Sequence, residues 1–485
     1  MALSIVTAKS APSAAKILAV GVFEGSLPDY VDADLMKAKG YTGKAGQYQT
    51  VNGPDGLVAL VGMGKVEDLT VETVRDTGAK ISRSAKKHSH VATTVVDQVP
   101  EGVDQVAAAQ AFAEGLAMGA YTYTEFKSAP EKSDLKRVTV LAGAAKITKA
   151  VALGAAVGEG VALARDLVNE PGGSLTPPKF AAQVQRMARR VGLKVKVMDK
   201  AAIEKAKLGG LLGVNQGSTH PARFVELTYE PDVKPKGTIA YVGKGITFDA
   251  GGLSIKTGNG MMTMKCDMGG AAAVIGAMSV LPAAKPPVRV RAYLPMTDNM
   301  LGGNAIRPGD VVKLRNGKTM EILNTDAEGR IILADALSLA SEAEPDAIVD
   351  LATLTGASMV ALGPKIAGRM GNDENWIDQV GAAAENAGER TWHLPLPADY
   401  RKMFDSSVAD IKNIGGPYGG SLTAGLILQE FVGEGIPWVH LDIAGPAFSD
   451  SADKLHPKGG TGFGVRTLVR LAQDYAKIPK KAAKK

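Results

Sequence analysis

The chain has 485 residues, 45% of them hydrophobic and 22% charged, which is typical of a globular protein long enough for two domains. Its single cysteine, Cys266, excludes an internal disulfide framework and favours a reducing compartment such as the cytoplasm. The sequence shows no secretory leader and no uninterrupted apolar run approaching the roughly 18 residues that span a bilayer, so we expect a cytoplasmic protein with no membrane partner.

The formal net charge of +6 raises the question of a nucleic-acid partner. Residues 1–165 are nevertheless almost neutral, with 18 Lys and Arg against 17 Asp and Glu. The segment 477–485 holds five lysines and no acidic residue, which indicates a flexible basic tail. Nucleic-acid binding is therefore an open alternative that the charge distribution does not support.

Short apolar runs and helical patterns alternate along the first third of the chain, as in an α/β domain. We expect strands at Ile17–Val22, Leu57–Gly62, Val91–Val96 and Val138–Leu141, and helices at Val71–Lys87, Val103–Met118 and Lys149–Leu167. The segment Asn169–Pro178 (NEPGGSLTPP) cannot continue the preceding helix, because it holds three prolines and two glycines. It marks the predicted domain boundary.

The same alternation resumes after this boundary and predicts a second α/β domain. We expect helices at Phe180–Val191, Ala271–Val280 and Ile331–Ala343, and strands at Lys194–Met198, Phe224–Tyr229, Thr238–Val242, Val288–Leu294 and Ala347–Leu351. Asn316 and Gly317 predict a type I′ hairpin turn between strands at Val311–Leu314 and Met320–Leu323. The predicted fold is a smaller N-terminal α/β domain and a larger C-terminal one with a mixed central sheet flanked by helices.

The segment 238–256 (TIAYVGKGITFDAGGLSIK) has an apolar strand that leads into a glycine-rich turn. It displays Lys244, Asp249 and Lys256 where α/β proteins place their ligand sites, at the carboxyl end of a strand. Asp267 follows in MKCDMGGAA, directly before a helix of small residues. Taken singly, each residue has an ordinary explanation, such as a turn aspartate or a solvated lysine.

The segment NTDAEGR places Asp326, Glu328 and Arg330 at alternate positions, so their side chains can project to one side. Together with Asp249 and Asp267, four carboxylates would then repel one another unless cations neutralised them. Two divalent cations about 3.5–4 Å apart would resolve that repulsion. None of the six histidines lies in these segments, so the predicted site is rich in oxygen ligands.

Three segments, VGKGITFDAGGLSIK, MKCDMGGAA and NTDAEGRIILADAL, resemble the signature blocks of the leucyl aminopeptidases, also called cytosol aminopeptidases. The resemblance spans residues 169–468 in order and spacing, while the first 165 residues match only in general layout. It implies a two-metal aminopeptidase that releases N-terminal residues from peptides, with leucine preferred within a broad specificity.

The resemblance also implies a role for each matching residue. One tightly held cation would take Lys244, Asp249, Asp267 and Glu328, and a more exchangeable one would take Asp249, Asp326 and Glu328. Lys244 would then bind as a neutral amine. Lys256 would stabilise the oxyanion of the tetrahedral intermediate, and Arg330 would hold a bicarbonate ion that acts as general base.

The implied cofactors are two divalent cations per subunit, Mn²⁺ or Zn²⁺, although an oxygen-rich site would also accept Mg²⁺ or Co²⁺. The substrate's free α-amine would bind one cation, which would restrict cleavage to the N-terminal residue. The residues that would line the substrate pocket are Met264, Asn324, Thr353, Leu354, Gly356 and Ala444.

The implied organisation is a macro-like N-terminal α/β domain at 1–168, a catalytic domain at 169–476 and the basic tail at 477–485. The family implies a homohexamer that acts on peptides with a free N-terminus. Two alternatives from other classes stay open: a nucleic-acid-binding regulator, and an interaction protein whose active site is dead.

Overall fold

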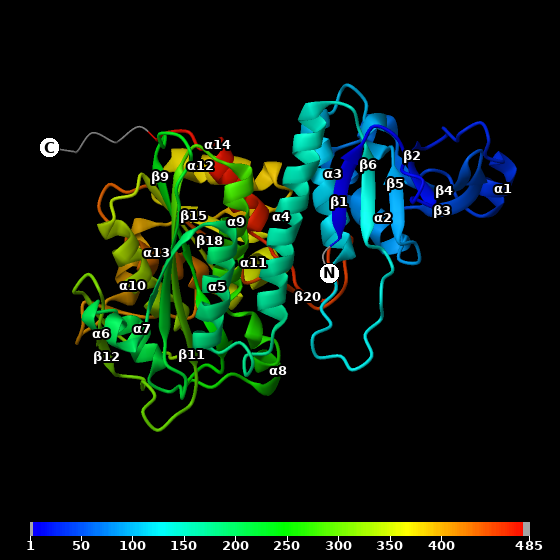
Figure 1. Cartoon of the computed structure of the whole chain (residues 1–485). Coiled ribbons are helices and arrows are strands. Elements are labelled where there is room, and N and C mark those ends of the chain that lie inside the picture. The colour runs from blue at the N-terminus through cyan, green and yellow to red at the C-terminus, as the bar shows by residue number, and fades with distance from the viewer. Residues whose placement is uncertain (1–2, 479–485) are drawn as a thin grey trace. The chain divides into compact units, whose positions relative to one another are not determined.

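The computed structural model describes residues 3–478, which form two compact α/β units (Figure 1). The first unit comprises Met1–Ala162 together with Ser451–Lys458, and the second comprises Leu163–Asp450 together with the chain from Gly459 onwards. Helix α4 (Ala145–Asn169) carries residues of both units. Except for its first two residues, the predicted basic tail at 477–485 lies outside the described residues.

The first unit contains a six-stranded sheet in which all neighbouring strands are parallel except the edge pair β3–β4. In spatial order the strands are β1 (Ser4–Ala8), β6 (Arg137–Leu141), β5 (His90–Thr93), β2 (Ile17–Phe23), β4 (Gly56–Gly64) and β3 (Tyr48–Gly53). The sequence predicts the four inner strands, which are the more apolar ones.

The predicted strand Val91–Val96 is wrong in its second half, where the 3-10 helix η2 (Val95–Gln98) replaces it. The side chain of Gln98 explains the change. Its Oε1 accepts from the Gly21 N–H at 2.6 Å, and its Nε2 donates to the Gly21 carbonyl at 3.1 Å. The chain therefore leaves the sheet after β5, because this amide takes over the bonds that a longer strand would make with β2.

Helices α2 (Val71–Ser84) and α3 (Gln105–Ala120) pack unusually close together. A Cβ at Gly115 would overlap the carbonyl oxygen of Arg75, so only glycine lets the two backbones approach this far. Arg75 Nε and Glu114 Oε2 form a buried ion pair across the same contact at 3.0 Å. The first unit thus depends on a tight helix pair with a satisfied charge inside it.

The segment Ser451–Lys458 adds to this unit although it is more than 280 residues away from the unit's other part. Lys454 Nζ lies 2.9 Å from Asp76 Oδ2, and Arg83 Nη1 donates to the Asp453 carbonyl at 2.6 Å. Both partners on α2, Asp76 and Arg83, are half-buried. The segment is therefore a return of the chain that the alternation pattern does not predict.

The second unit contains a nine-stranded mixed sheet. In spatial order its strands are β16 (Thr391–His393), β15 (Ala367–Gly371), β18 (Trp438–Asp442), β14 (Ala347–Ala352), β9 (Thr238–Gly243), β11 (Arg289–Asn299), β8 (Arg223–Tyr229) and β7 (Lys194–Met198), with β10 (Gly245–Asp249) paired to β11. Strands β18, β14, β9, β11 and β10 run parallel, so their carboxyl ends meet at one edge.

Helices cover both faces of this sheet (Figure 1). One face packs against α7 (Gly209–Asn215), α10 (Gly329–Glu342) and α13 (Gly420–Gln429), and the other against α5 (Pro177–Val191), α9 (Gly269–Ala284), α12 (Glu374–Asn386) and α14 (Val465–Asp474). The second unit also contains helices α6 (Lys200–Lys205), α8 (Gly258–Met261) and α11 (Gly356–Leu362), and the 3-10 helices η3 (Met264–Cys266) and η4 (Ala398–Phe404). Helix α1 (Ala33–Ala38) and the 3-10 helix η1 (Val66–Asp68) belong to the first unit. Both faces of the parallel strands are buried, as their continuous apolar runs predict.

Three short strands and one two-stranded pair lie outside the main sheets: β12 (Val311–Lys313), β13 (Thr319–Glu321) and β17 (Ile411–Lys412), and β19 (Phe448–Ser449) with β20 (Gly459–Gly460). The predicted type I′ turn between β12 and β13 is wrong. Only Gly317 has a positive φ, of 91°, and its N–H donates to the Leu314 carbonyl at 2.9 Å. This is the pattern of a type I turn followed by a left-handed glycine, which the longer loop requires.

Two helical segments are long and apolar enough to cross a membrane by length and composition, Ala145–Asn169 and Gly258–Ala284. The apolar window of the second is 83% buried inside the protein, as in the core helix of a folded domain. Half of the window in the first is buried. Alanine, valine and leucine residues give both helices their high mean hydropathy, although polar residues and glycines interrupt each apolar run.

We predict that Gly115→Ala destabilises the protein by about 1–3 kcal/mol, because the added methyl group forces α2 and α3 apart. Thermal and urea unfolding would measure the loss. Gly143→Ala is the matched control, since a Cβ at Gly143 meets no atom within 4 Å. Equal stability of the two variants would contradict the close-packing argument.

Candidate metal centre

The predicted functional residues gather at the edge of the larger sheet where its parallel strands end. Lys244 directly follows β9, Asp249 ends β10, and Thr353 directly follows β14. Asp267 lies in the turn before α9, and the segment 324–328 leads into α10. Ligand sites of α/β sheets lie at this edge, because the strand-to-helix turns project their side chains there.

Lys244 is buried, and its ammonium group lies among oxygen atoms from three segments. Its Nζ lies 2.8 Å from Asp267 Oδ1 and 2.7 Å from Glu328 Oε1, and it donates to the Thr353 carbonyl at 2.9 Å. Gly329 leaves the space for it: a Cβ there would lie 2.7 Å from Lys244 Cε and 2.8 Å from Nζ. A larger residue at position 329 would therefore displace the amine from its partners.

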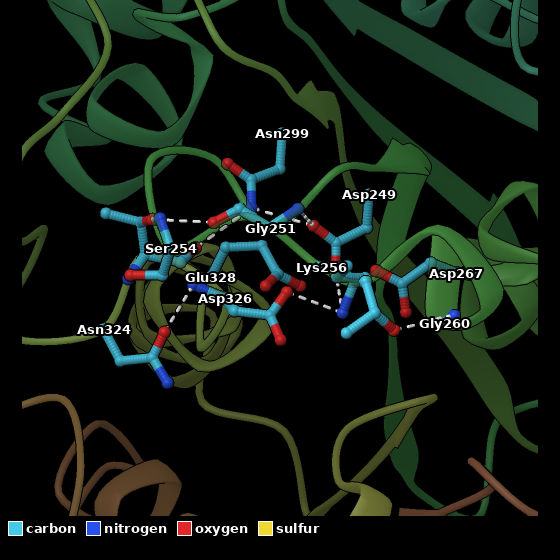
Figure 2. A network of polar contacts seen from close by, with 12 residues as sticks. Asp249, Gly251, Ser254, Lys256, Gly260, Asp267, Asn299, Asn324, Asp326 and Glu328 are labelled. Carbon is cyan, nitrogen blue, oxygen red and sulfur yellow. Dashed lines mark hydrogen bonds and ion pairs between the residues drawn. The ribbon is translucent and has the colours of Figure 1, made fainter. Parts of the chain in front are cut away.

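A second lysine, Lys256, bridges two other carboxylates (Figure 2). Its Nζ lies 2.9 Å from Asp249 Oδ2 and 2.6 Å from Asp326 Oδ1. The remaining oxygen of Asp249, Oδ1, accepts from the Gly251 N–H and from Asn299 Nδ2, each at 2.8 Å. Asp249 is thus held in place by three donors from two different segments.

Thr325 ties the loop that carries Lys256 to the segment that carries Asp326. Its hydroxyl donates to the Gly251 carbonyl at 2.6 Å and accepts from the Ser254 N–H at 2.8 Å. Gly251 has a φ of 86°, which glycine adopts without strain. The two segments therefore form one hydrogen-bonded unit, although about 70 residues separate them.

Three carboxyl groups of the centre, those of Asp249, Asp267 and Asp326, are destabilised as anions. Burial raises the pKa of Asp267 well above its usual range, although the Lys244 ammonium opposes the shift. Burial and the neighbouring Glu328 charge raise the pKa of Asp249, and burial raises that of Asp326. Burial lowers the pKa of Lys244, but the surrounding carboxylates outweigh it and the net shift is upward. Two lysines thus leave the four carboxylates short of positive charge.

Unpaired oxygen atoms show where further positive charge fits. In the described part of the chain, Asp267 Oδ2 and Glu328 Oε2 are buried without a hydrogen-bond partner. One oxygen atom each from Asp249, Asp326 and Glu328 lie within 4.8 Å of one another. Converging carboxylate oxygens are ligands that Mn²⁺, Mg²⁺ and Zn²⁺ accept, so the residues present fit a divalent-metal centre.

A cleft of about 180 Å³ adjoins this centre. Its lining includes Asn324, Asp326 and Arg330 from the start of α10, the turn Leu354–Gly356 after β14, and residues 414–416 with Gly420 and Thr423 from the α13 region. Carboxylate and guanidinium groups thus share a small cleft with apolar and glycine residues. Such a mixture suits a substrate that carries both a charged group and an apolar side chain.

Arg330 lies at this cleft as a buried cation. Its Nη1 donates to the Asn413 carbonyl at 2.9 Å, and its Nε has no hydrogen-bond partner among the described residues. Burial lowers the pKa of Arg330 to about 10, a shift that the charges of Glu328 and Asp442 oppose. The group remains cationic near neutral pH and has a donor available for an anion.

The six residues predicted to line the pocket occupy different surroundings. Asn324, Leu354 and Gly356 line the cleft. Thr353 instead supports the centre, since its hydroxyl donates to Asp267 Oδ1 at 2.8 Å. Met264 begins η3 and Ala444 follows β18, and neither belongs to the residues that line this cleft.

The sequence did not predict the glycine-rich wall at 414–420, the support by Asn299 or the buried Asp442. Signals for two of these were present. The run GGPYGG precedes an apolar helix, and WVHLD is an apolar run that ends in an acid, as the segment ending in Asp249 does. For Asn299 the predicted strand ended at Leu294, whereas β11 continues to Asn299.

Comparison with known proteins assigns the N-terminal and the C-terminal part of the chain to two domains of one protein family. Residues 162–469 match the catalytic domain of the cytosol aminopeptidase family, and residues 8–130 match the N-terminal domain of the same family. Probable cytosol aminopeptidases from Rippkaea orientalis and Aquifex aeolicus are each 42% identical over 94% of this chain, and the matches cover 96% and 94% of their own lengths. The chain is therefore a peptidase, a hydrolase in class. It belongs to the cytosol aminopeptidase family, as its signature segments predict.

Solved structures confirm the two-domain α/β fold. The bottromycin maturation enzyme BotP in complex with Mn is 40% identical, with a TM-score of 0.89, and the match covers 95% of this chain and 99% of that one. A mutant of tomato leucine aminopeptidase is 33% identical, with a TM-score of 0.87, and the match covers 98% and 97%. The manganese complex and the acidic cluster of this chain together indicate dependence on a divalent metal.

We expect Gly329→Ala to weaken metal binding by roughly 10–100-fold, as loss of support around a metal site typically does. The added methyl group would push Lys244 from Asp267 and Glu328, and Lys244 cannot yield cheaply because three partners hold it. Equilibrium dialysis against Mn²⁺ would measure the affinity. Gly258→Ala is the control, since a Cβ at Gly258 meets nothing within 4 Å; equal affinity in both variants would refute this account of Gly329.

Proposed function

We propose that the protein is a two-metal aminopeptidase that releases N-terminal residues, leucine preferentially, from peptides. One observation carries the proposal: Asp249, Asp326 and Glu328 converge within 4.8 Å at the sheet edge, directly beside the buried Lys244–Asp267 pair. Family membership supports the peptidase activity. The number of metals, the role of each residue and the preference for leucine are the finer parts of the proposal.

The family resemblance implies the two ligand sets, and the groups that lie together support them. Lys244, Asp249, Asp267 and Glu328 would hold one cation, and Asp249, Asp326 and Glu328 would hold the second. When bound, the cations would lower the pKa of water and polarise the carbonyl of the scissile peptide bond. The unpaired Asp267 Oδ2 and Glu328 Oε2 support this assignment, because a buried carboxylate oxygen needs a partner. Lys244 would join the first set as a neutral amine.

Lys256 would supply a positive charge to the reacting carbonyl oxygen. Burial lowers the pKa of Lys256, but the carboxylates of Asp249 and Asp326 outweigh it, so the side chain stays cationic. A fixed cation that faces the developing oxyanion lowers the barrier to its formation. Lys256 contacts Asp326, which lines the cleft, and this contact supports the proposed role.

Arg330 would hold a bicarbonate ion that accepts the proton of the attacking water. Its buried guanidinium and its unpaired Nε suit a small planar anion, which guanidinium groups bind through two parallel hydrogen bonds. The cation that Asp326 would help to hold at this cleft would bind the free α-amine of the substrate. The apolar side chains of Leu354 and Ile414, with glycines around them, suit an aliphatic residue such as leucine.

The wider setting is also part of the proposal. We expect Mn²⁺ or Zn²⁺ as the native metal, and manganese in the BotP complex supports the first. A cytoplasmic location agrees with the family name and with a single, buried cysteine. A homohexamer is the assembly that the family resemblance implies.

We predict that Asp326→Ala and Glu328→Ala each lower hydrolysis of Leu-p-nitroanilide by at least about a thousand-fold, because each removes a metal ligand. Chelation should abolish wild-type activity, and added Mn²⁺ or Zn²⁺ should restore it. Asp310→Ala is the control, since among the described residues the half-buried carboxylate of Asp310 pairs with Arg307 alone. Full activity of either ligand variant after chelation, or equal cleavage of N-acetyl-Leu-p-nitroanilide, would refute the proposal.

Lys256→Ala should lower kcat by about 100–1000-fold while both metals remain bound, because it removes charge from the oxyanion and not a ligand. Metal content by mass spectrometry and steady-state kinetics would separate the two effects. Lys256→Arg, which keeps the charge, should recover part of the turnover. Loss of metal from the alanine variant would show instead that Lys256 is needed for metal binding.

A further inference from the structure

Asp442, the last residue of β18, is a buried carboxylate to which the metal-centre proposal gives no role. Its side chain is 1% exposed. Its Oδ1 accepts from the backbone N–H groups of Leu354 and Ala444 at 3.2 Å and of Thr355 at 3.4 Å. Its Oδ2 accepts the Thr355 hydroxyl at 2.6 Å. A carboxylate with this many uncharged donors is rigidly oriented, and it fixes the groups that donate to it.

The hydrogen-bond chain beyond Asp442 has a defined direction. A carboxylate only accepts, so the single proton of the Thr355 hydroxyl goes to Asp442. Thr355 Oγ1 therefore accepts in its two other contacts, from the Ser358 N–H at 3.0 Å and from the Ser421 hydroxyl at 3.0 Å. Ser421 must be the donor in the latter pair. The carboxylate thereby sets the polarity of a relay that runs from α13 to β18.

This relay joins the walls of the cleft. Ser421 belongs to the first turn of α13, next to the cleft residue Gly420. Thr355 lines the cleft itself, between Leu354 and Gly356, and caps α11. Asp442 lies behind this wall and does not line the cleft. One buried carboxylate thus holds the turn after β14 in register with α13.

We propose that Asp442 is a positioning residue that sets the width of the substrate cleft and so determines how tightly the substrate side chain binds. The inference rests on the proposed function, since it takes the cleft to be the peptide site. Asp442 makes no hydrogen bond or ion pair, among those of the described residues, with any of the five proposed metal ligands. Its loss should therefore affect substrate binding and selectivity while metal binding persists.

The test compares Asp442→Ala with Asp442→Asn. The alanine variant leaves four donors without an acceptor, so KM for Leu-p-nitroanilide should rise about 10-fold or more, and the preference for leucine over alanine substrates should fall by a similar factor. The asparagine oxygen can serve the backbone donors while its amide donates to Thr355, which would then donate to Ser421. This variant should stay within about 3-fold of the wild-type KM. Both should retain full metal content.

Asp350→Ala is the matched control, because Asp350 is equally buried but bonds to Trp438 and His440, away from the cleft. It should reduce stability without changing selectivity. Ser421→Ala removes only the first donor of the relay, and it should raise KM even if Asp442→Ala fails to fold.

Unchanged KM and selectivity in the alanine variants of Asp442 and Ser421, or an equal change in the Asp350 control, would overturn the positioning role alone. A metal-loaded wild-type protein without peptidase activity would instead overturn the proposed function, and this inference with it.

Discussion

The burial of a lysine ammonium between two carboxylates is the constraint on which the rest of the catalytic unit depends. Lys244 could not be buried without Asp267 and Glu328, because an isolated charge in the interior costs many kcal/mol. The two partners come from different segments, one before α9 and one before α10. For both carboxylates to reach the amine of Lys244, α9 and α10 must both begin beside the end of β9.

Small residues make this convergence sterically feasible. Gly270 lets α9 approach β14 closely, since a Cβ there would overlap the Leu351 carbonyl, and Gly329 leaves room for the Lys244 side chain. The glycines of the signature segments therefore act on packing as much as on turn conformation. Charge and shape together explain why the segments that hold the carboxylates tolerate so little backbone bulk.

The sequence predicted the parts of the fold that are encoded locally. Strands β9 and β14 were predicted because a strand that is buried on both faces is apolar throughout. Such a run can be recognised without knowing which strands lie beside it. The hairpin between β12 and β13 is present, but its predicted turn type was wrong, because two turn types share the Asn-Gly signal and the loop length separates them. The last residues of the long strand β11 were missed, since polar residues follow Met296 and their pairing with β10 is not visible in the local sequence.

In the functional site, too, locally encoded residues were predicted and residues that act through distant contacts were not. The five proposed metal ligands lie in compact motifs, so their chemistry was visible from spacing and from the family resemblance. The cleft wall at 414–423 and the carboxylate of Asp442 act through contacts across 66–88 residues of sequence. Such contacts depend on which strands become neighbours, and no local pattern around Ser421 or Asp442 encodes that order.

The return segment Ser451–Lys458 has a consequence for the order in which the chain can mature on the ribosome. All six strands of the first sheet, and the α2–α3 pair, lie before residue 142, so this unit can form its core early in synthesis. The contacts that the return segment makes with Asp76 and Arg83 must wait until the chain has emerged as far as Lys454. Completion of the N-terminal unit therefore requires that the catalytic unit has been synthesised at least as far as Asp450.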